Sequence, residues 1–277
     1  MRPVLVGIIG GTGKMGTFFG EVFSRAGHVV LCAGRHTDVT PRDIARDCEL
    51  VIVSVPIRQT VDVIDSIAPV LTEEQILSDL TSLKVMPVRA MLKSKARVLG
   101  MHPMFGPSVT SLLGQTIVVT PARCDNAAME KVTSILRDQG ARITQSTPGE
   151  HDRLMAIVQG LTHFVTLCVA DTTRRMNIRP EETVPYMSPV YQMEMGLVGR
   201  LLGQDPSLYG DMLMMNPYVG PVLSACEESV KTLAGCINDE NMDEFIELFQ
   251  KNSRHFGEYC RTATEETDYL IESLVGR

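Results

Sequence analysis

Residues 4–16 read VLVGIIGGTGKMG, an apolar run that leads directly into a glycine-rich turn. The run is typical of a buried strand, and apolar side chains return with helical spacing over Thr17–Ala26. Gly11, Gly13 and Gly16 fit the pattern G-x-G-x-x-G, which is weak evidence when it occurs alone. Between a strand and a helix, these glycines allow a tight turn, close approach of a pyrophosphate and close helix–strand packing. The stretch therefore predicts a dinucleotide-binding turn; the alternative is a glycine-rich turn that binds no ligand.

Strand and helix patterns alternate through the first half of the chain. Besides residues 4–9, we expect strands at Val29–Cys32, Leu50–Val55, Ile76–Leu80, Val98–Met101 and Ile117–Thr120. Between several of them we expect helices at Thr60–Ala68, Val85–Leu92 and Ala127–Asp138. This alternation predicts an α/β fold that begins with a Rossmann-type, doubly wound and mostly parallel sheet.

The pattern changes at Thr147-Pro148-Gly149, beyond which the sequence is helical with prolines between the segments. We therefore predict a dinucleotide-binding domain over residues 1–148 and an all-α domain over residues 149–277, which binds substrate and dimerises. Sixteen methionines and much apolar helix surface support a homodimer through the helical domain.

Composition narrows the class of protein. The chain has 277 residues, 44% hydrophobic content and a formal net charge of -7, which suits two soluble domains. The acidic balance argues against nucleic acid as a partner, because such binding depends on neutralising phosphates. The seven cysteines are scattered without metal-ligand spacing, so we expect reduced cytoplasmic thiols and no metal site. We see no run of ~20 apolar residues and no signal peptide, and expect no membrane partner.

The choice of coenzyme should be decided after the second strand, where Ala33-Gly34-Arg35-His36-Thr37 follows. NAD enzymes usually carry an acid here for the ribose hydroxyls. Gly34 offers no carboxylate, and the guanidinium of Arg35 can bind a 2′-phosphate. We therefore expect NADP in preference to NAD, with Arg35 and His36 as contacts. The alternative is that Arg35 is solvated and Asp38 supplies the acid.

Ligands of open α/β sheets bind outside the carboxyl ends of the strands. The turns in Val51–Pro56 and Asp79–Lys84 are therefore expected to face the nicotinamide. Lys84 could instead be a surface lysine at the start of a helix. The predicted cofactor contacts are Gly11, Thr12, Gly13, Lys14, Met15, Gly16, Arg35, His36, Ser54, Val55, Pro56, Ser82 and Lys84.

A polar stripe marks the apolar helix Leu154–Ala170, which reads LMAIVQGLTHFVTLCVA. Gln159, His163 and Thr166 recur at i, i+4 and i+7, which places them on one helix face. A buried polar row either pairs internally or lines a cleft where a ligand supplies partners. Beside a nucleotide fold, we favour the cleft.

Together these segments resemble the prephenate and arogenate dehydrogenases of tyrosine biosynthesis, in particular the dehydrogenase part of the bifunctional bacterial enzymes. The resemblance covers nearly the whole chain. The segment LGMHPMFGP and the histidine helix are much more specific than the glycine motif. The matching segments are Gly7–Gly16, Val51–Pro56, Asp79–Lys84, Leu99–Pro107, Glu150–Asp152, Gln159–Phe164, Ser188–Tyr191 and Val198–Leu201.

The resemblance implies oxidative decarboxylation of a cyclohexadienyl substrate, with hydride transfer to NAD(P). His163 stands where the family places its catalytic histidine, which binds the C4 hydroxyl, and Arg200 matches an arginine that holds a substrate carboxylate. We expect the side-chain hydroxyl of Thr110 to orient His163 or the substrate. Further expected substrate contacts are Gln159, Gln192, His102 and Ser108, and the nearby Ser111 lies in the same loop as Ser108.

Several roles stay open at this stage. His102 could simply hold its turn, and Asp152, beside His151, is at least as suited to capping a helix as to catalysis. Gly196 and Gly199 share a helix face with Gln192 and Arg200, which leaves room for a ligand or a neighbouring backbone. Some relatives carry arginine at Gln192 and an acid near Gly34, so the substrate subtype stays open and NADP is favoured.

Two other hypotheses compete with a prephenate or arogenate dehydrogenase. One is another NADP-dependent dehydrogenase or reductase of the 6-phosphogluconate-dehydrogenase-like architecture, such as an imine reductase. Such enzymes commonly use a lysine and an asparagine on one helix, which we do not find. The other is a non-catalytic NADP-sensing protein, against which His163 and Arg200 argue. We also expect a monofunctional enzyme, since no mutase or regulatory segment flanks these motifs.

Overall fold

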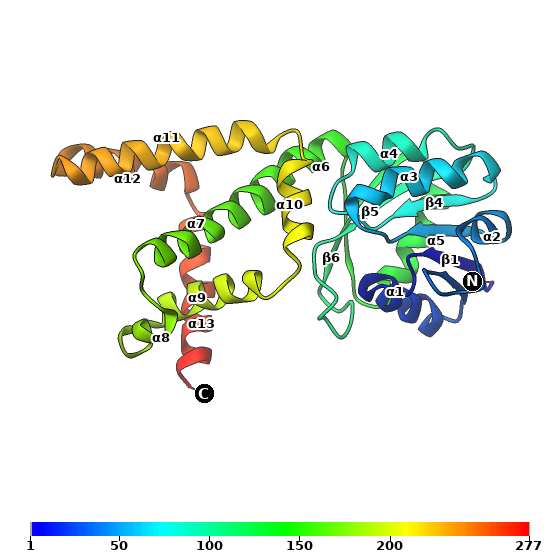
Figure 1. The fold of residues 1–277 in the computed structure, drawn as a ribbon, viewed down its shortest axis with the longest axis horizontal. Helices are drawn as coiled ribbons and strands as arrows, with labels where there is room; N and C mark the ends of the chain where they lie inside the picture. Colours follow the sequence, from blue (N-terminus) through cyan, green and yellow to red (C-terminus); the bar gives the residue numbers. More distant parts are fainter. Residues whose placement is uncertain (1, 277) are drawn as a thin grey trace. The chain divides into compact units, whose positions relative to one another are not determined.

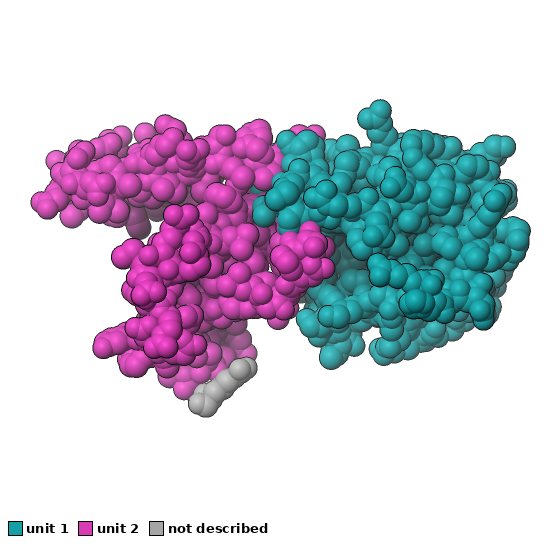
Figure 2. Space-filling model, in the orientation of Figure 1, with its two compact units in different colours: residues 1–156, 210–217 teal, residues 157–209, 218–277 magenta. Residues whose placement is uncertain are grey.

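The computed structural model describes residues 2–276 and divides into two compact units, each described here by itself (Figure 2). The first unit runs to residue 156 and includes residues 210–217, and the second comprises residues 157–209 and those from 218 onward. The predicted division at residue 148 differs from this one. Asn216 donates to the backbone carbonyl of Asp152 at 2.8 Å, and Arg58 donates to Asp211. These bonds join residues 210–217 to the first unit.

The first unit contains one sheet of seven strands in the order β2-β1-β3-β4-β5-β6-β7 (Figure 1). Neighbouring strands are parallel except β5 and β6, which pair antiparallel. The strands are β1 Leu5–Ile9, β2 Val29–Ala33, β3 Leu50–Val53, β4 Ile76–Asp79, β5 Arg97–Pro103, β6 Thr116–Arg123 and β7 Arg142–Gln145. The Rossmann-type sheet is therefore confirmed. Strand β7 was not predicted, because this short and largely exposed edge strand lacks a buried apolar run.

Helices cover both faces of the sheet. Alternate residues of β3 point to opposite faces, so Leu50 and Ile52 join one core while Val51 and Val53 join the other. Helices α1 and α5 contribute to the first core, and α2, α3 and α4 to the second. Their bounds are α1 Lys14–Arg25, α2 Pro41–Asp47, α3 Ile57–Ile67, α4 Val85–Met91 and α5 Asn126–Arg137, with the 3₁₀ turn η1 Ala68–Val70. Only α2, a single short helix opened by a Thr40/Asp43 capping box, was not expected.

After α6, every element in the described residues is helical, as predicted. Helix α7 packs against α9, α9 against α13, and α11 and α13 against α12. Many large apolar side chains of these helices are exposed, among them Leu197, Phe249 and Phe256. The bounds are α6 Pro148–Met155, π-helical η2 Ala156–Leu161, α7 Thr162–Arg175, α8 Pro180–Thr183, η3 Val184–Tyr186, α9 Pro189–Leu202, α10 Pro206–Met214, α11 Val219–Asn238, α12 Met242–Phe256 and α13 Tyr259–Val275.

One helical stretch, Pro148–Arg175, corrects a prediction. Its most apolar 18 residues have a mean hydropathy of 1.5, so by length and composition it could cross a membrane. Gln159 and His163 interrupt its apolar run, so the sequence shows no unbroken run of ~20 apolar residues, whereas the mean hydropathy over the window tolerates these two residues. A single helix of this kind is weak evidence for a membrane, because core and interface helices of soluble proteins have the same composition.

Candidate active site

The glycine-rich turn after β1 is closely packed. Gly10 has a φ of +82°, and its N–H donates to the carbonyl of Ala33 at 2.8 Å. A Cβ on Gly10 would lie 2.1 Å from the carbonyl oxygen of Ser54, and one on Gly16 would lie 2.3 Å from that of Gly10. Neither position can accommodate a side chain without moving backbone. Both therefore fix the path of the turn into α1.

The turn opens onto a cavity of about 670 Å³. Helix α1 begins beside it with no side-chain cap at Gly13 and no acidic residue in its first turn, which leaves N–H groups for a phosphate. Among the described residues that line the cavity there is no carboxylate. They are Ile9, Gly10, Thr12, Gly13, Ala33, Gly34, Arg35, His36, Thr37, Pro41, Ser54, Val55, Pro56, Gln59 and Val63. This lining suits a dinucleotide with its negative charges.

The predicted cofactor contacts fall into two groups. Thr12, Gly13, Arg35, His36, Ser54, Val55 and Pro56 line the cavity. Gly11, Lys14, Met15, Gly16, Ser82 and Lys84 are not among its lining residues. Asp38, the alternative ribose acid, does not line it either. Gln59 and Thr37 line the cavity without having been predicted, because a polar residue in a helix or turn gives no pattern of its own.

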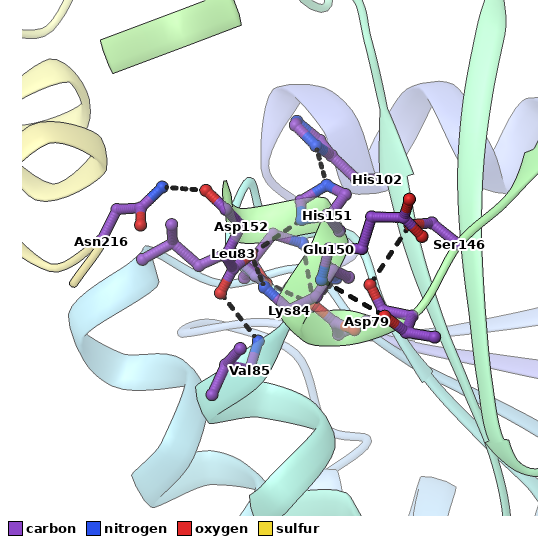
Figure 3. A network of polar contacts seen from close by, with 12 residues as sticks. Asp79, Leu83, Lys84, Val85, His102, Ser146, Glu150, His151, Asp152 and Asn216 are labelled. Atoms are coloured by element: carbon purple, nitrogen blue, oxygen red, sulfur yellow. Dashed lines mark hydrogen bonds and ion pairs between the residues drawn. The ribbon is translucent and has the colours of Figure 1, made fainter. Parts of the chain in front are cut away.

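Lys84 is fully buried, so its interpretation as a surface lysine is wrong. Its ammonium group donates to the carboxylate of Asp79 and, at 2.7 Å, to the carbonyl of Met101 (Figure 3). Thr81 donates its N–H to the same carboxylate at 3.0 Å. Burial lowers the pKa of Lys84, and the charge of Asp79 opposes that shift. Removing the lysine alone would leave Asp79 as an uncompensated buried charge, which typically costs about 3–5 kcal/mol.

Asp152 caps helix α4 and not its own helix, which it was expected to cap. Its carboxylate accepts the N–H groups of Lys84 at 2.8 Å and Val85 at 2.9 Å, at the start of α4. Its own helix, α6, is capped by Thr147, which accepts the N–H of Glu150 at 3.2 Å. Asp152 therefore joins α6 to α4. The sequence separation between these partners explains why local patterns could not show the contact.

His102, near the end of β5, is buried against His151 of α6, with ring centroids 5.0 Å apart. Its Nδ1 atom lies 2.8 Å from His151 Nε2. Ser108, Thr110 and Ser111 are exposed on the loop between β5 and β6. The first unit thus holds the cavity, the Lys84–Asp79 pair and the two histidines.

The second unit brings together three other side chains. His163, in α7, contacts the ring of Tyr209 in α10, with centroids 4.8 Å apart. Burial lowers the pKa of His163. Burial raises the pKa of Tyr209, and the nearby positive charge of Arg200 in α9 partly offsets that shift. Tyr209 was not predicted, because a single tyrosine in a short helix carries no motif.

The remaining predicted substrate residues are also in the second unit. Gln159 lies in the π-helical segment η2, and Gln192 is exposed on α9. A Cβ on Gly196 or Gly199 would meet no atom within 4 Å, so the helix face leading to Arg200 is open. Thr166 pairs internally instead, donating to the carbonyl of Thr162 at 2.8 Å.

Comparison with known proteins identifies the family. The model described as "Prephenate dehydrogenase, nucleotide-binding domain" matches residues 26–145, and "Prephenate dehydrogenase, dimerization domain" matches residues 147–251. The chain belongs to the prephenate dehydrogenase family. This confirms the family identified from sequence motifs.

Individual relatives agree with this assignment. A protein of Methanocaldococcus jannaschii named "Probable arogenate/prephenate dehydrogenase" is 32% identical over 97% of this chain. The "T-protein" of Haemophilus influenzae is 32% identical over 96% of the chain. The chain spans 65% of the length of the first relative and 70% of the second. The dehydrogenase names place the relatives among the oxidoreductases, as the resemblance implied.

Solved structures show the same fold. Prephenate dehydrogenase from A. aeolicus, in complex with hydroxyphenyl propionate and NAD+, gives a TM-score of 0.73 at 20% identity over 92% of this chain and 98% of that one. Arogenate dehydrogenase of Synechocystis gives 0.69 at 17% identity over 92% of this chain and 99% of that one. An imine reductase from Bacillus cereus gives 0.50 over 72% of this chain. The competing reductase architecture is thus less similar.

Proposed function

We propose that this chain oxidises and decarboxylates a cyclohexadienyl substrate, prephenate or arogenate, with NAD(P)+ as hydride acceptor. The observation that carries the proposal is the partly buried imidazole of His163, which contacts Tyr209, in a chain of this family. The positive charge of Arg200 in turn acts on Tyr209. The cavity at the glycine turn supplies a site of suitable charge for the dinucleotide.

His163 acts as the base. Because burial lowers its pKa, the imidazole is neutral at physiological pH and can accept a proton. It takes the proton of the C4 hydroxyl while the hydrogen on C4 leaves with its electron pair. When bound, a nicotinamide coenzyme would supply the acceptor for that hydride. The ring carboxylate then departs as CO₂, the electrons of the broken C–C bond complete the aromatic ring, and His163 returns its proton to the phenolic oxygen.

The other predicted residues bind and orient the substrate. Arg200 holds a carboxylate through its bidentate fork. Gln159 and Gln192 supply polar contacts, and Thr110 orients the substrate. Ser108 and His102 complete the substrate contacts.

We propose NADP as the preferred coenzyme. Gly34, Arg35 and His36 all line the cavity. The described lining residues include no carboxylate that would repel a 2′-phosphate. A Schizosaccharomyces pombe relative, 25% identical, is named "Probable prephenate dehydrogenase [NADP(+)]", whereas the A. aeolicus structure contains NAD+. The proposed preference for NADP therefore rests on the cavity residues of this chain and not on the names of its relatives.

We propose further that the protein is a cytoplasmic homodimer formed through its helical domain. The description of the second family model as a dimerization domain supports this arrangement. So do the exposed apolar side chains of α9, α12 and α13, such as Leu197, Phe249 and Leu270.

The test is a spectrophotometric screen of prephenate and arogenate against NAD+ and NADP+. We expect reduction of the coenzyme with at least one substrate, and faster reduction with NADP+. Absence of turnover in all four combinations, with coenzyme binding intact, would favour the non-catalytic NADP-sensing hypothesis instead.

A further inference from the structure

The side chain of Thr12, in the glycine-rich turn, packs directly against Gly34, which follows β2. A Cβ on Gly34 would lie 2.2 Å from Thr12 Oγ1, 2.7 Å from its Cγ2 and 3.0 Å from its Cβ. Rotation about the Cα–Cβ bond of Thr12 moves Oγ1 and Cγ2 but not Cβ, and carbon atoms 3.0 Å apart are closer than ordinary van der Waals contact. A side chain at position 34 therefore conflicts with threonine at position 12.

The backbone on both sides of this contact is held in place. Strands β1 and β2 are parallel neighbours, so the turns that follow them lie side by side. The N–H groups of Gly10 and Gly11 both donate to the carbonyl of Ala33, at 2.8 and 3.1 Å. Neither turn can move away from the other without breaking these bonds, which keep Thr12 against Gly34.

The turn after β2 is closed by Thr37. Its Oγ1 accepts the N–H of Gly34 at 2.9 Å and donates to the carbonyl of Val39 at 2.8 Å. This leaves Arg35 exposed, directly after the glycine that Thr12 contacts. Thr12 is also exposed, and both residues line the cavity of about 670 Å³. The guanidinium and the hydroxyl are therefore both available to a ligand in that cavity.

The space that Thr12 fills has a known use in NAD enzymes, which usually carry an acid after the second strand for the ribose hydroxyls. Here the nearest atom to a Cβ on Gly34 is a hydroxyl oxygen. A hydroxyl can donate to a phosphate oxygen, and a hydrogen bond to an ionised acceptor is roughly twice as strong as one between neutral groups. Beside Arg35, this hydroxyl suits a 2′-phosphate.

We propose that Thr12 sets the choice of coenzyme in this chain. Its side chain excludes an acid from position 34, and its hydroxyl donates, together with Arg35, to the 2′-phosphate of NADP. The inference deepens the proposed function and rests on its preference for NADP. It gives the turn after β1 a role in selectivity, whereas the glycines of that turn serve the pyrophosphate that both coenzymes carry.

Binding of NADP+ and NAD+, which differ only in the 2′-phosphate, tests the role of the hydroxyl. Isothermal titration calorimetry with the full-length protein measures both Kd values without substrate and without turnover. We expect the wild type to bind NADP+ more tightly. Thr12→Val keeps the branched shape but not the hydroxyl, and should weaken NADP+ binding by roughly tenfold while leaving the Kd for NAD+ unchanged. Thr12→Ser keeps the hydroxyl and should retain the wild-type ratio of the two Kd values.

Thr17→Val is the matched control. It removes a hydroxyl that donates to the carbonyl of Gly11 at 3.2 Å in the same turn, and Thr17 does not line the cavity. We expect its ratio of Kd values to match the wild type. A wild-type ratio in Thr12→Val, or equal weakening of both coenzymes, would overturn the role of Thr12 but not the preference for NADP. Equal binding of both coenzymes by the wild type would refute that preference, and the inference with it.

A double-mutant cycle tests the steric part of the proposal. The Tm is measured for the wild type, Gly34→Asp, Thr12→Gly and the combined variant. We expect Gly34→Asp to lower the Tm, or to prevent folding, in the wild-type background and to cost less in the Thr12→Gly background. The combined variant should also bind NAD+ more tightly than NADP+. Equal losses of Tm in both backgrounds would show that Thr12 does not exclude an acid from position 34.

Discussion

The imidazole of His163 and the ring of Tyr209 meet edge to face, with centroids 4.8 Å apart and planes at 89°. Such aromatic pairs contribute roughly 0.5–1.5 kcal/mol beyond the area they bury. The contact fixes the plane of the imidazole and covers part of it from water. Since burial is what lowers the pKa of His163, Tyr209 helps to keep the proposed base neutral.

Tyr209→Leu should therefore change the pH dependence of the reaction. With the ring removed, water reaches His163 and its lowered pKa rises toward the ordinary value. A base works only above its pKa, so the acid limb of the kcat profile should move to higher pH. Tyr209→Phe keeps the ring and should keep the limb in place. An unshifted limb in Tyr209→Leu would show that the tyrosine has no influence on the base.

His163→Asn should lower kcat by ~10²–10⁴, the usual contribution of a general base, with little change in substrate KM. The reason is that the proton moves only in the transition state. Thr166→Ala on the same helix is a suitable control, because its hydroxyl bonds within the helix. Steady-state kinetics measure both constants, and near-normal kcat in His163→Asn would remove the assigned role.

Arg200→Gln should raise the substrate KM while leaving the Kd for coenzyme intact, because it removes a carboxylate contact that is present throughout binding. Loss of one charge-assisted hydrogen bond corresponds to roughly 10- to 150-fold in affinity. Arg174→Gln is the control, since Arg174 pairs with Asp171 on the surface of the same unit. Equal damage to coenzyme and substrate binding would contradict the assignment.

Arg35→Ala should lower kcat/KM with NADP+ by at least tenfold and leave the value with NAD+ nearly unchanged, because only NADP+ carries the 2′-phosphate. Arg42→Ala is the matched control, as Arg42 does not line the cavity.

A second test introduces at position 34 the carboxylate that NAD enzymes usually carry after the second strand, and it requires two substitutions. A Cβ on Gly34 would lie 2.2 Å from Thr12 Oγ1, so Gly34→Asp should be combined with Thr12→Gly. Unchanged coenzyme preference in both tests would locate selectivity elsewhere.

The parts of the fold that sequence reasoning found are those with local causes. The apolar run of β1 and the glycines after it are contiguous in the sequence, and a Cβ on Gly16 would meet the carbonyl oxygen of Gly10 in the same turn. The helices of the second half are likewise predicted by the helical spacing of their apolar residues. Edge strand β7 was missed because Arg142, Thr144 and Gln145 are not the residues of a buried strand.

The parts that it missed depend on contacts between distant segments. Lys84 follows a strand end and looks like a turn residue, but the sheet buries it against Asp79 and the backbone of β5. Asp152 looks like a cap for its own helix, but Thr147 takes that role locally. Tyr209 approaches His163 only because α10 returns to α7. Such pairings follow from packing, which single-sequence patterns do not encode.

The most direct test of the proposed activity is the stoichiometry of one turnover reaction with the wild-type protein and the substrate that it accepts. CO₂, reduced coenzyme and aromatic product should be measured together in the same sample. The proposed mechanism predicts equal amounts of all three, because hydride loss and decarboxylation together form the ring. Reduced coenzyme that accumulates without CO₂ and without an aromatic product would contradict it and point to an ordinary alcohol or amine oxidation.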